Sequence, residues 1–193
     1  MSPFEFSQYG VDLAAIQLAH ERIRPYVRHT PTLTCPALDE RFNAKIFLKC
    51  ENLQAVGAFK ARGASNAIFS LTDAEAERGV VTHSSGNHAA AVARAASLCG
   101  ITAHIVMPEN SSPKKIANVK KYGVEPVFCE PTAESRQNTA QAIIDKTGGT
   151  LIHPYDDLLT IAGQGTAALE LMEQAPDLDL IIVPVGGGGL LAG

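Results

Sequence analysis

The residue best suited to covalent chemistry in this chain is Lys60. It lies in the stretch Val56-Gly57-Ala58-Phe59-Lys60-Ala61-Arg62-Gly63-Ala64. Glycines on both sides let the backbone approach a flat ligand closely, and partial burial lowers the pKa of a lysine amine. A lysine that forms an imine with a carbonyl compound needs both properties. On this stretch alone a solvated surface lysine is the commoner interpretation, because most lysines are exposed.

A candidate anion site follows in the stretch Thr82-His83-Ser84-Ser85-Gly86-Asn87-His88. It joins the short apolar run 79–81 to an alanine-rich helix expected at 88–99. Hydroxyl groups, an amide and unpaired backbone N–H groups at a helix N-terminus suit a carboxylate.

A second candidate loop is the glycine run 186–189, which directly follows the apolar run 178–183. Successive glycine N–H groups can curl round a phosphate with no side chain in the way. A flexible linker is the alternative, but linkers do not usually lie between two apolar segments. The run is not a dinucleotide fingerprint, because Leu191 stands where the third glycine is needed.

Taken together, these loops resemble the fold type II pyridoxal-phosphate enzymes, specifically the serine/threonine dehydratase and serine racemase group. The matching stretches, in the family's order, are Gly57-Ala58-Phe59-Lys60-Ala61-Arg62-Gly63-Ala64, Ser84-Ser85-Gly86-Asn87-His88, Ala162-Gly163-Gln164-Gly165-Thr166 and Pro184-Val185-Gly186-Gly187-Gly188-Gly189. The resemblance runs from about Thr30 to the last residue. The chain departs from the family at Ala58, where serine is common, and it stops just after the glycine loop, where family members continue.

The resemblance implies a cofactor, pyridoxal 5'-phosphate, bound as an imine of Lys60. In the family, the freed lysine amine then takes the α-proton of an amino-acid substrate, so Lys60 is the expected catalytic base. Phe59 packs on the cofactor ring and Asn87 bonds the ring hydroxyl. The residues implied to bind the cofactor are Phe59, Lys60, Asn87, Gly186, Gly187, Gly188 and Gly189. Arg62 is interpreted as a structural partner.

The resemblance also implies a set of residues that contact the substrate. Ser84, Ser85, Asn87 and His88 are expected to receive the α-carboxylate at the helix N-terminus. Ser85 is also a candidate catalytic residue, whose hydroxyl would shuttle a proton on the substrate face opposite Lys60; a carboxylate contact alone is the equal alternative. Arg136 matches an arginine that serine racemase places near dicarboxylates, and a guanidinium offers a carboxylate two hydrogen bonds. An exposed arginine on a solvated helix is the alternative.

The function expected first is ammonia-lyase chemistry, in which β-elimination converts L-serine or L-threonine to a 2-oxo acid and ammonia. A 3-hydroxyaspartate ammonia-lyase, supported by Arg136, is a close second, and serine racemase is a further alternative. β-Replacement, as in cysteine synthase, ranks lower because those relatives usually carry threonine where His88 stands. An alternative of another class is a catalytically incomplete fragment that lacks the C-terminal segment and binds cofactor poorly.

Composition limits the remaining function classes. The chain has 193 residues, 46% hydrophobic and 19% charged, which is typical of a globular protein. Its net charge of −4 argues against nucleic-acid binding. Four cysteines and the histidines outside the loops show no metal-ligand spacing, so no metal is expected; the cysteines are interpreted as small core residues in a reducing compartment. Without a signal peptide or an apolar run of about 18 residues, the protein is expected to be cytoplasmic and to bind no membrane. A homo-oligomer, a dimer, is expected at full length.

The elements that position these loops alternate between strands and helices. Asp12 caps an expected helix with apolar residues at helical spacing, and Thr72-Asp73-Ala74-Glu75 is a capping-box pattern. Strands are expected at 45–50, 80–82, 103–107, 125–129, 150–152 and 179–183, and helices at 60–71, 88–99, 113–122, 132–147 and 158–174.

This alternation predicts an α/β fold. The resemblance specifies two open, mostly parallel sheets with helices on both faces, as in tryptophan synthase β, with the C-terminal part missing from this chain. The expected division is residues 1–72 as the first part of a large domain, 73–147 as a small domain and 148–193 as the incomplete second part of the large one.

Overall fold

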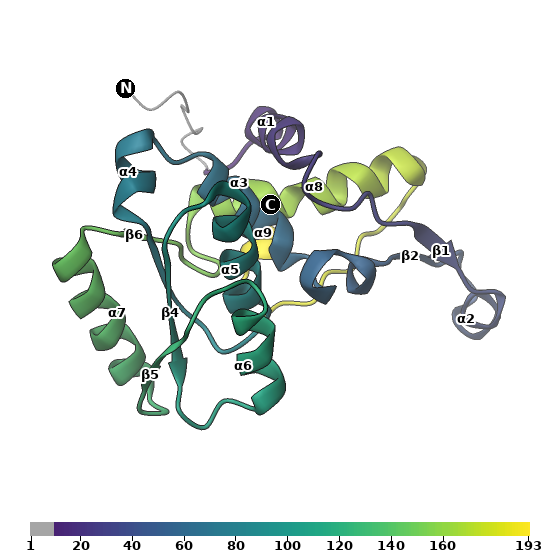
Figure 1. The fold of residues 1–193 in the computed structure, drawn as a ribbon. Coiled ribbons are helices and arrows are strands. Elements are labelled where there is room, and N and C mark those ends of the chain that lie inside the picture. The colour runs from purple at the N-terminus through teal and green to yellow at the C-terminus, as the bar shows by residue number, and fades with distance from the viewer. Residues whose placement is uncertain (1–9) are drawn as a thin grey trace.

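The computed structural model describes residues 10–193; the first nine, on which the expected lack of a signal peptide rests, lie outside the described residues. The main sheet has four strands (Figure 1). These are β3 (Val80–His83), β4 (Ala103–Pro108), β5 (Val127–Cys129) and β6 (Thr150–Leu151). They lie in the order β5-β4-β3-β6, and every neighbouring pair is parallel.

Helices cover both faces of this sheet. Helix α5 (Asn87–Cys99) lies on one face and α7 (Ala133–Thr147) on the other (Figure 1). Because strand side chains alternate, each face buries its own apolar set. The α5 face buries Val80, Ile105 and Met107, and the α7 face buries Val81 and Val106. The predicted α/β class, with a parallel sheet between helices, is confirmed.

Helices α1 (Leu13–Ile23), α3 (Lys60–Phe69) and α8 (Leu158–Gln174) pack together, and Lys60 is the first residue of α3. Helix α3 packs against both α5 and α8, and α1 lies along α8 (Figure 1). The predicted cap of α1 is confirmed, because the Asp12 carboxylate accepts a hydrogen bond from the Ala15 N–H at 2.9 Å. A short helix, α9 (Gly189–Ala192), contacts α8.

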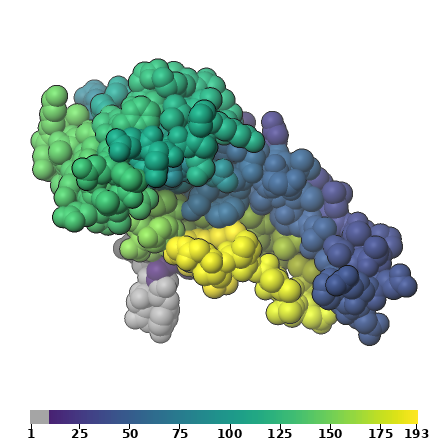
Figure 2. Space-filling model, turned by 90° about the horizontal axis from the view of Figure 1, so that it is seen from below, coloured from purple at the N-terminus to yellow at the C-terminus, as the bar shows by residue number. Residues whose placement is uncertain are grey.

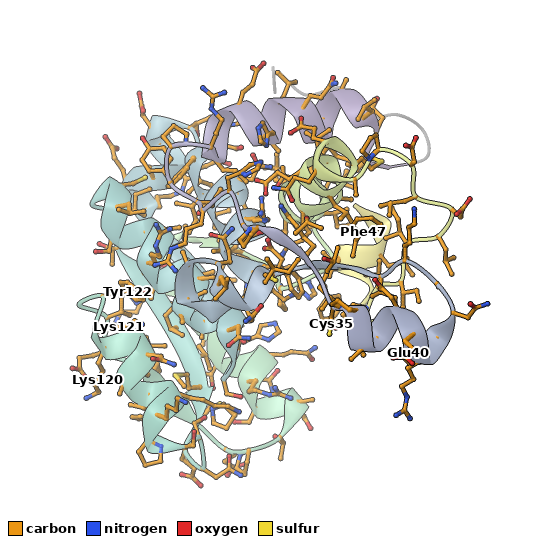
Figure 3. All side chains as sticks on the ribbon, turned by 90° about the vertical axis from the view of Figure 1, so that its right-hand side faces the viewer. Cys35, Glu40, Phe47, Lys120, Lys121 and Tyr122 are labelled. Atoms are coloured by element: carbon orange, nitrogen blue, oxygen red, sulfur yellow. The ribbon has the colours of Figure 1, made fainter. Side chains whose placement is uncertain are left out.

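The remaining elements lie toward the surface. Helix α4 (Asp73–Arg78) begins with the predicted capping box at Thr72, and α6 (Pro113–Lys120) follows β4. Strands β1 (Thr32–Thr34) and β2 (Phe47–Lys49) flank α2 (Pro36–Phe42), and the 3₁₀ turns η1 (Glu51–Leu53) and η2 (Ala55–Gly57) lead to α3. Figure 3 shows how far apart two of these regions are: the labelled residues of the β1–α2–β2 region lie on the opposite side from those at the end of α6.

The second sheet differs from the expected one. Among the described residues it contains only β1 and β2, and this pair is antiparallel. The predicted strand 179–183 does not form, because no described segment offers it a hydrogen-bonding partner. Leu180 and Ile182 are 73% and 86% exposed, and the C-terminal segment, yellow in Figure 2, lies along one surface.

The cysteines also differ from their interpretation as core residues. All four are free thiols, but Cys35, Cys50 and Cys129 are half-buried and Cys99 is exposed. The proposed division at residues 72 and 147 stays a prediction; the parallel sheet takes its strands from residues 80–151. Within residues 10–193, none of the helices combines the length and apolar character needed to cross a membrane.

Candidate active site

An unusual backbone turn delivers the chain to Lys60. Val56 has φ 58° and Gly57 has φ 74°, so two consecutive residues adopt the left-handed conformation. A β-branched residue rarely takes this conformation, which costs of the order of 1–3 kcal/mol and is concentrated at functional sites. The turn places Phe59 and Lys60 at the first turn of α3.

Two glycines let α3 approach α8 very closely. A Cβ added at Gly163 would lie 2.6 Å from the Gly63 Cα, and a Cβ added at Gly63 would lie 2.6 Å from the Thr160 carbonyl oxygen. The Gly63 N–H also donates to the Gln164 side chain at 3.1 Å. The Ala162–Thr166 motif therefore serves to fix α3, the helix that begins at Lys60, against α8.

A buried network of charges joins the same two helices. Arg62 is fully buried and donates to Glu170 at 2.7 and 2.8 Å and to Glu51 at 2.8 and 2.8 Å. Lys49 donates to Glu170 at 2.7 Å. Burial alone raises the pKa of Glu170, but hydrogen bonds from Arg62 and Lys49 lower it below the ordinary carboxyl value. These ion pairs confirm the structural interpretation of Arg62.

Lys60 faces a cavity of about 330 Å³. Phe59, Lys60 and Tyr155 line one part of it, and residues 184–190 line the rest. The Lys60 Nζ donates a hydrogen bond to the Pro154 carbonyl and lies 5.2 Å from the centroid of the Phe59 ring. Burial lowers the pKa of the Lys60 amine, which favours the neutral form that attacks a carbonyl group.

The glycine run forms the opposite wall of this cavity. A Cβ added at Gly187 would lie 2.3 Å from the Tyr155 ring, so only glycine fits there. Nothing lies within 4 Å of a Cβ added at Gly186, and Gly188 has φ +88°. Backbone N–H groups of such a turn, with open space in front of them, suit a phosphate. A ligand with both a carbonyl group and a phosphate therefore fits the cavity between Lys60 and the glycines.

The predicted carboxylate loop lies at the carboxyl end of β3. Ser84 and Ser85 are half-buried, and Asn87 is exposed at the start of α5. The Ser84 Oγ accepts the Gly86 N–H at 3.2 Å, which tightens the turn into the helix. None of these residues lines the Lys60 cavity. They provide an edge at which hydroxyl, amide and helix N–H groups are available to an anion.

His88 is placed differently from the other residues of that loop. Its ring is 2% exposed, and Nε2 lies 3.0 Å from the Ile152 carbonyl oxygen. Burial is the main cause that lowers its pKa to about 3; the hydrogen bond with the Ile152 carbonyl opposes this shift, and the charges of Lys60, His153 and His83 add to it. The predicted carboxylate contact from His88 therefore has its backbone N–H, at the helix N-terminus, as the available donor.

Arg136 lies at the beginning of α7, with its Nε donating to the Thr132 carbonyl at 3.2 Å. Burial, followed by the charges of His153 and Arg136, lowers the pKa of His83, the last residue of β3. The His83 and His153 rings meet edge to face, with centroids 5.9 Å apart. The charge of Arg136 therefore influences His83, the residue before Ser84, but Arg136 does not line the Lys60 cavity.

The segment after β6 was not predicted to take part in the site. The Pro154 carbonyl and the Tyr155 ring both belong to it, and the His153 ring packs edge to face on Tyr155 with centroids 4.7 Å apart. The sequence could have indicated this role, because the segment directly follows a predicted strand. Residues that follow parallel strands gather where open α/β sheets bind ligands. Among the described residues no group of three or more His, Cys, Asp or Glu side chains is arranged to hold a metal.

Similar proteins share this sequence and fold. The sequence model of the family described as pyridoxal-phosphate dependent enzyme matches residues 23–193. Serine racemase from Oryza sativa subsp. indica is 51% identical over 185 residues, 96% of this chain and 55% of the relative. The beta-hydroxyaspartate dehydratase of Paracoccus denitrificans (strain Pd 1222) is 50% identical over 175 residues, 91% of this chain and 56% of the relative.

A solved structure of maize serine racemase superposes with a TM-score of 0.93 and 51% identity, over 95% of this chain and 56% of that one. The chain thus spans about half the length of the curated relatives it matches.

Proposed function

Since the chain belongs to the pyridoxal-phosphate-dependent enzyme family, we propose that it is part of an ammonia-lyase acting on L-serine and L-threonine. The products are a 2-oxo acid and ammonia. The family's cofactor is pyridoxal 5'-phosphate, which matches the fit of the cavity for a carbonyl group and a phosphate. The observation that carries the proposal is the Lys60 amine, whose pKa is lowered by burial, facing the glycine run across that cavity.

Residues of the cavity and of the loop after β3 both have a part in this proposal. When bound, pyridoxal 5'-phosphate withdraws electrons from the substrate α-carbon. Lys60 holds the cofactor, Phe59 packs beside its ring, Asn87 bonds its hydroxyl, and Gly186–Gly189 hold its phosphate. Once the amino-acid substrate has displaced it from the cofactor, the Lys60 Nζ would take the α-proton. Burial lowers the pKa of this amine, which favours the neutral form that accepts a proton.

We place elimination before racemisation because it needs fewer proton-transferring groups. Elimination needs one base at the α-carbon, and Lys60, which lines the cavity, can provide it. Racemisation needs a second proton-transferring group on the opposite face, for which Ser85, half-buried in the loop after β3, is the candidate. The relatives named serine racemase make racemisation the competing reaction. Both products should therefore be measured, as 2-oxo acid and as D-serine formed from L-serine. A rate of D-serine formation above that of pyruvate would refute the lyase proposal.

A second candidate substrate is 3-hydroxyaspartate. Arg136 supports it, because this arginine lies on the edge that carries Ser84 and would pair with a second carboxylate. One relative is named beta-hydroxyaspartate dehydratase. The experiment compares kcat/KM for L-serine, L-threonine and 3-hydroxyaspartate in wild type and Arg136→Ala, with the exposed Arg41→Ala as the matched control.

The expected result separates the substrates. A lost charge pair costs about 2–5 kcal/mol, so kcat/KM for 3-hydroxyaspartate should fall at least 30-fold in Arg136→Ala and stay unchanged in Arg41→Ala. An equal loss for all three substrates would make Arg136 a structural residue. A cytoplasmic location, a dimeric full-length enzyme and weak cofactor binding by these 193 residues alone stay predictions.

A further inference from the structure

The Ile152 carbonyl oxygen is held by two buried side chains. His88 Nε2 lies 3.0 Å from it, and the Thr82 hydroxyl donates to it at 2.8 Å. Both donors are at least 98% buried, at 2% and 0% exposure, and Ile152 is 3% exposed. A carbonyl that accepts two buried hydrogen bonds is fixed in position, because losing either bond leaves a polar group unsatisfied.

Two of the three residues that follow this carbonyl reach Lys60 or its cavity. The Pro154 carbonyl accepts a hydrogen bond from the Lys60 Nζ. Tyr155 lines the cavity, and its ring would be only 2.3 Å from a Cβ at Gly187. The segment that begins at Ile152 therefore touches both the amine and the glycine wall.

His88 is a neutral hydrogen-bond donor in this arrangement. A carbonyl oxygen only accepts, so the proton of the ring is on Nε2. The buried Nδ1 has no hydrogen-bond partner among the described residues. Burial and the charges of Lys60, His153 and His83 lower the pKa of His88 to about 3, so the ring stays neutral near pH 7. The neutral ring therefore serves to hold the Ile152 carbonyl, because a proton on Nδ1 would place a positive charge at a buried site.

We propose that His88 is a positioning residue for Lys60, acting through the segment 152–155. Its Nε2–H bond fixes the Ile152 carbonyl, and this places the Pro154 carbonyl at the Lys60 amine and the Tyr155 ring against Gly187. The inference rests on the proposed function, because it assigns His88 to the same cofactor cavity.

The test compares two amide variants that differ only in reach, made in the full-length protein. In His88→Gln the side-chain N–H reaches the position of the histidine Nε2, whereas in His88→Asn it is one carbon short. The first measurement is the Kd for pyridoxal 5'-phosphate, by absorbance titration. The second is hydrogen exchange at the Tyr155 and Asp156 amides in the cofactor-free protein; both amides donate to the His153 Nδ1, at 3.4 and 2.8 Å.

We expect His88→Gln to keep a Kd within threefold of wild type and His88→Asn to raise it at least tenfold. Exchange at Tyr155 and Asp156 should be faster in the Asn variant only. Equal Kd values for the two variants would overturn the inference. So would a raised Kd without faster exchange, because His88 would then act by another route.

Two controls keep the outcome interpretable. Thr82→Val removes the other donor to the Ile152 carbonyl with little change in volume, so it should also speed exchange and raise the Kd. This variant replaces His88→Asn in the test if His88→Asn does not fold. Normal exchange and a normal Kd in Thr82→Val would overturn the inference. Ile144→Ala destabilises the core on the α7 face of the sheet, outside the cluster that contains Ile152, and should leave the Kd unchanged. If wild type does not attach the cofactor to Lys60, the proposed function fails, whereas the exchange comparison still tests the bond from His88 to the Ile152 carbonyl.

Discussion

Replacing Glu170 by glutamine should be one of the most destabilising single changes in this chain. The carboxylate is 1% exposed and accepts two bonds from Arg62 and one from Lys49, at 2.7 to 2.8 Å. Two cations and two anions balance in the network, and Glu51 alone would be left to pair with both cations. Breaking a buried ion pair by removing one partner costs about 3–5 kcal/mol. The free energy of unfolding should fall by that amount.

A surface pair in the same chain provides the matched control. Lys120 and Glu125 are also 2.7 Å apart, but their side chains are 46% and 78% exposed. Exposed pairs contribute about 0–1 kcal/mol, so Glu125→Gln should change stability by less than that. Urea unfolding followed by circular dichroism measures both variants. A loss in Glu170→Gln no larger than in Glu125→Gln would refute the role given to burial.

The same network predicts how stability depends on pH. The folded-state pKa of Glu170 is lowered, so its contribution is present above the unfolded carboxyl value of about 4.3 and is lost as the pH falls below it. Wild type should therefore lose stability on acidification below about pH 4.3 more steeply than Glu170→Gln. Parallel slopes for the two proteins would contradict this assignment.

Three further results are expected. Because the pKa of His88 is lowered to about 3, the free energy of unfolding of wild type should fall by about 1.4 kcal/mol per pH unit between about pH 6.5 and 3. Urea unfolding of His88→Gln should lack this pH dependence, and equal slopes for the two proteins would contradict the prediction. Gly187→Ala should lower both the melting temperature and cofactor affinity, because its Cβ meets the Tyr155 ring, whereas Gly186→Ala should keep the melting temperature and lose affinity alone. Ser85→Ala should abolish D-serine formation if its hydroxyl moves the second proton, and intact D-serine formation would remove that role.

Local rules predicted the elements where capping chemistry is complete. Thr72 and Glu75 form the capping box that begins α4, and α8 has the predicted bounds, 158 and 174. Segments whose structure depends on distant partners were predicted less well. The apolar run 179–183 has the composition of a buried strand, but a strand needs a neighbour, and none of the described segments pairs with it.

In the candidate site, too, some residues can be predicted from the sequence and others depend on the fold. Lys60 and the glycine run could be proposed from the sequence once several loops were considered together, because the Lys60 stretch alone also fits a surface lysine. Tyr155 could not, because an aromatic residue after a strand is common and only the fold brings it to Gly187. His88 follows Asn87 directly, but successive helix residues point about 100° apart. One is therefore exposed at the loop, whereas the other is buried against Ile152.

The most direct test of the proposed chemistry is reductive trapping on Lys60. The full-length protein is incubated with pyridoxal 5'-phosphate, reduced with borohydride, digested and analysed by mass spectrometry. We predict that the phosphopyridoxyl group is found on the peptide that contains Lys60, and that Lys60→Ala carries no label there and loses the absorbance of the bound cofactor. A label on another lysine in wild type, or unchanged absorbance in Lys60→Ala, would contradict the assignment of Lys60.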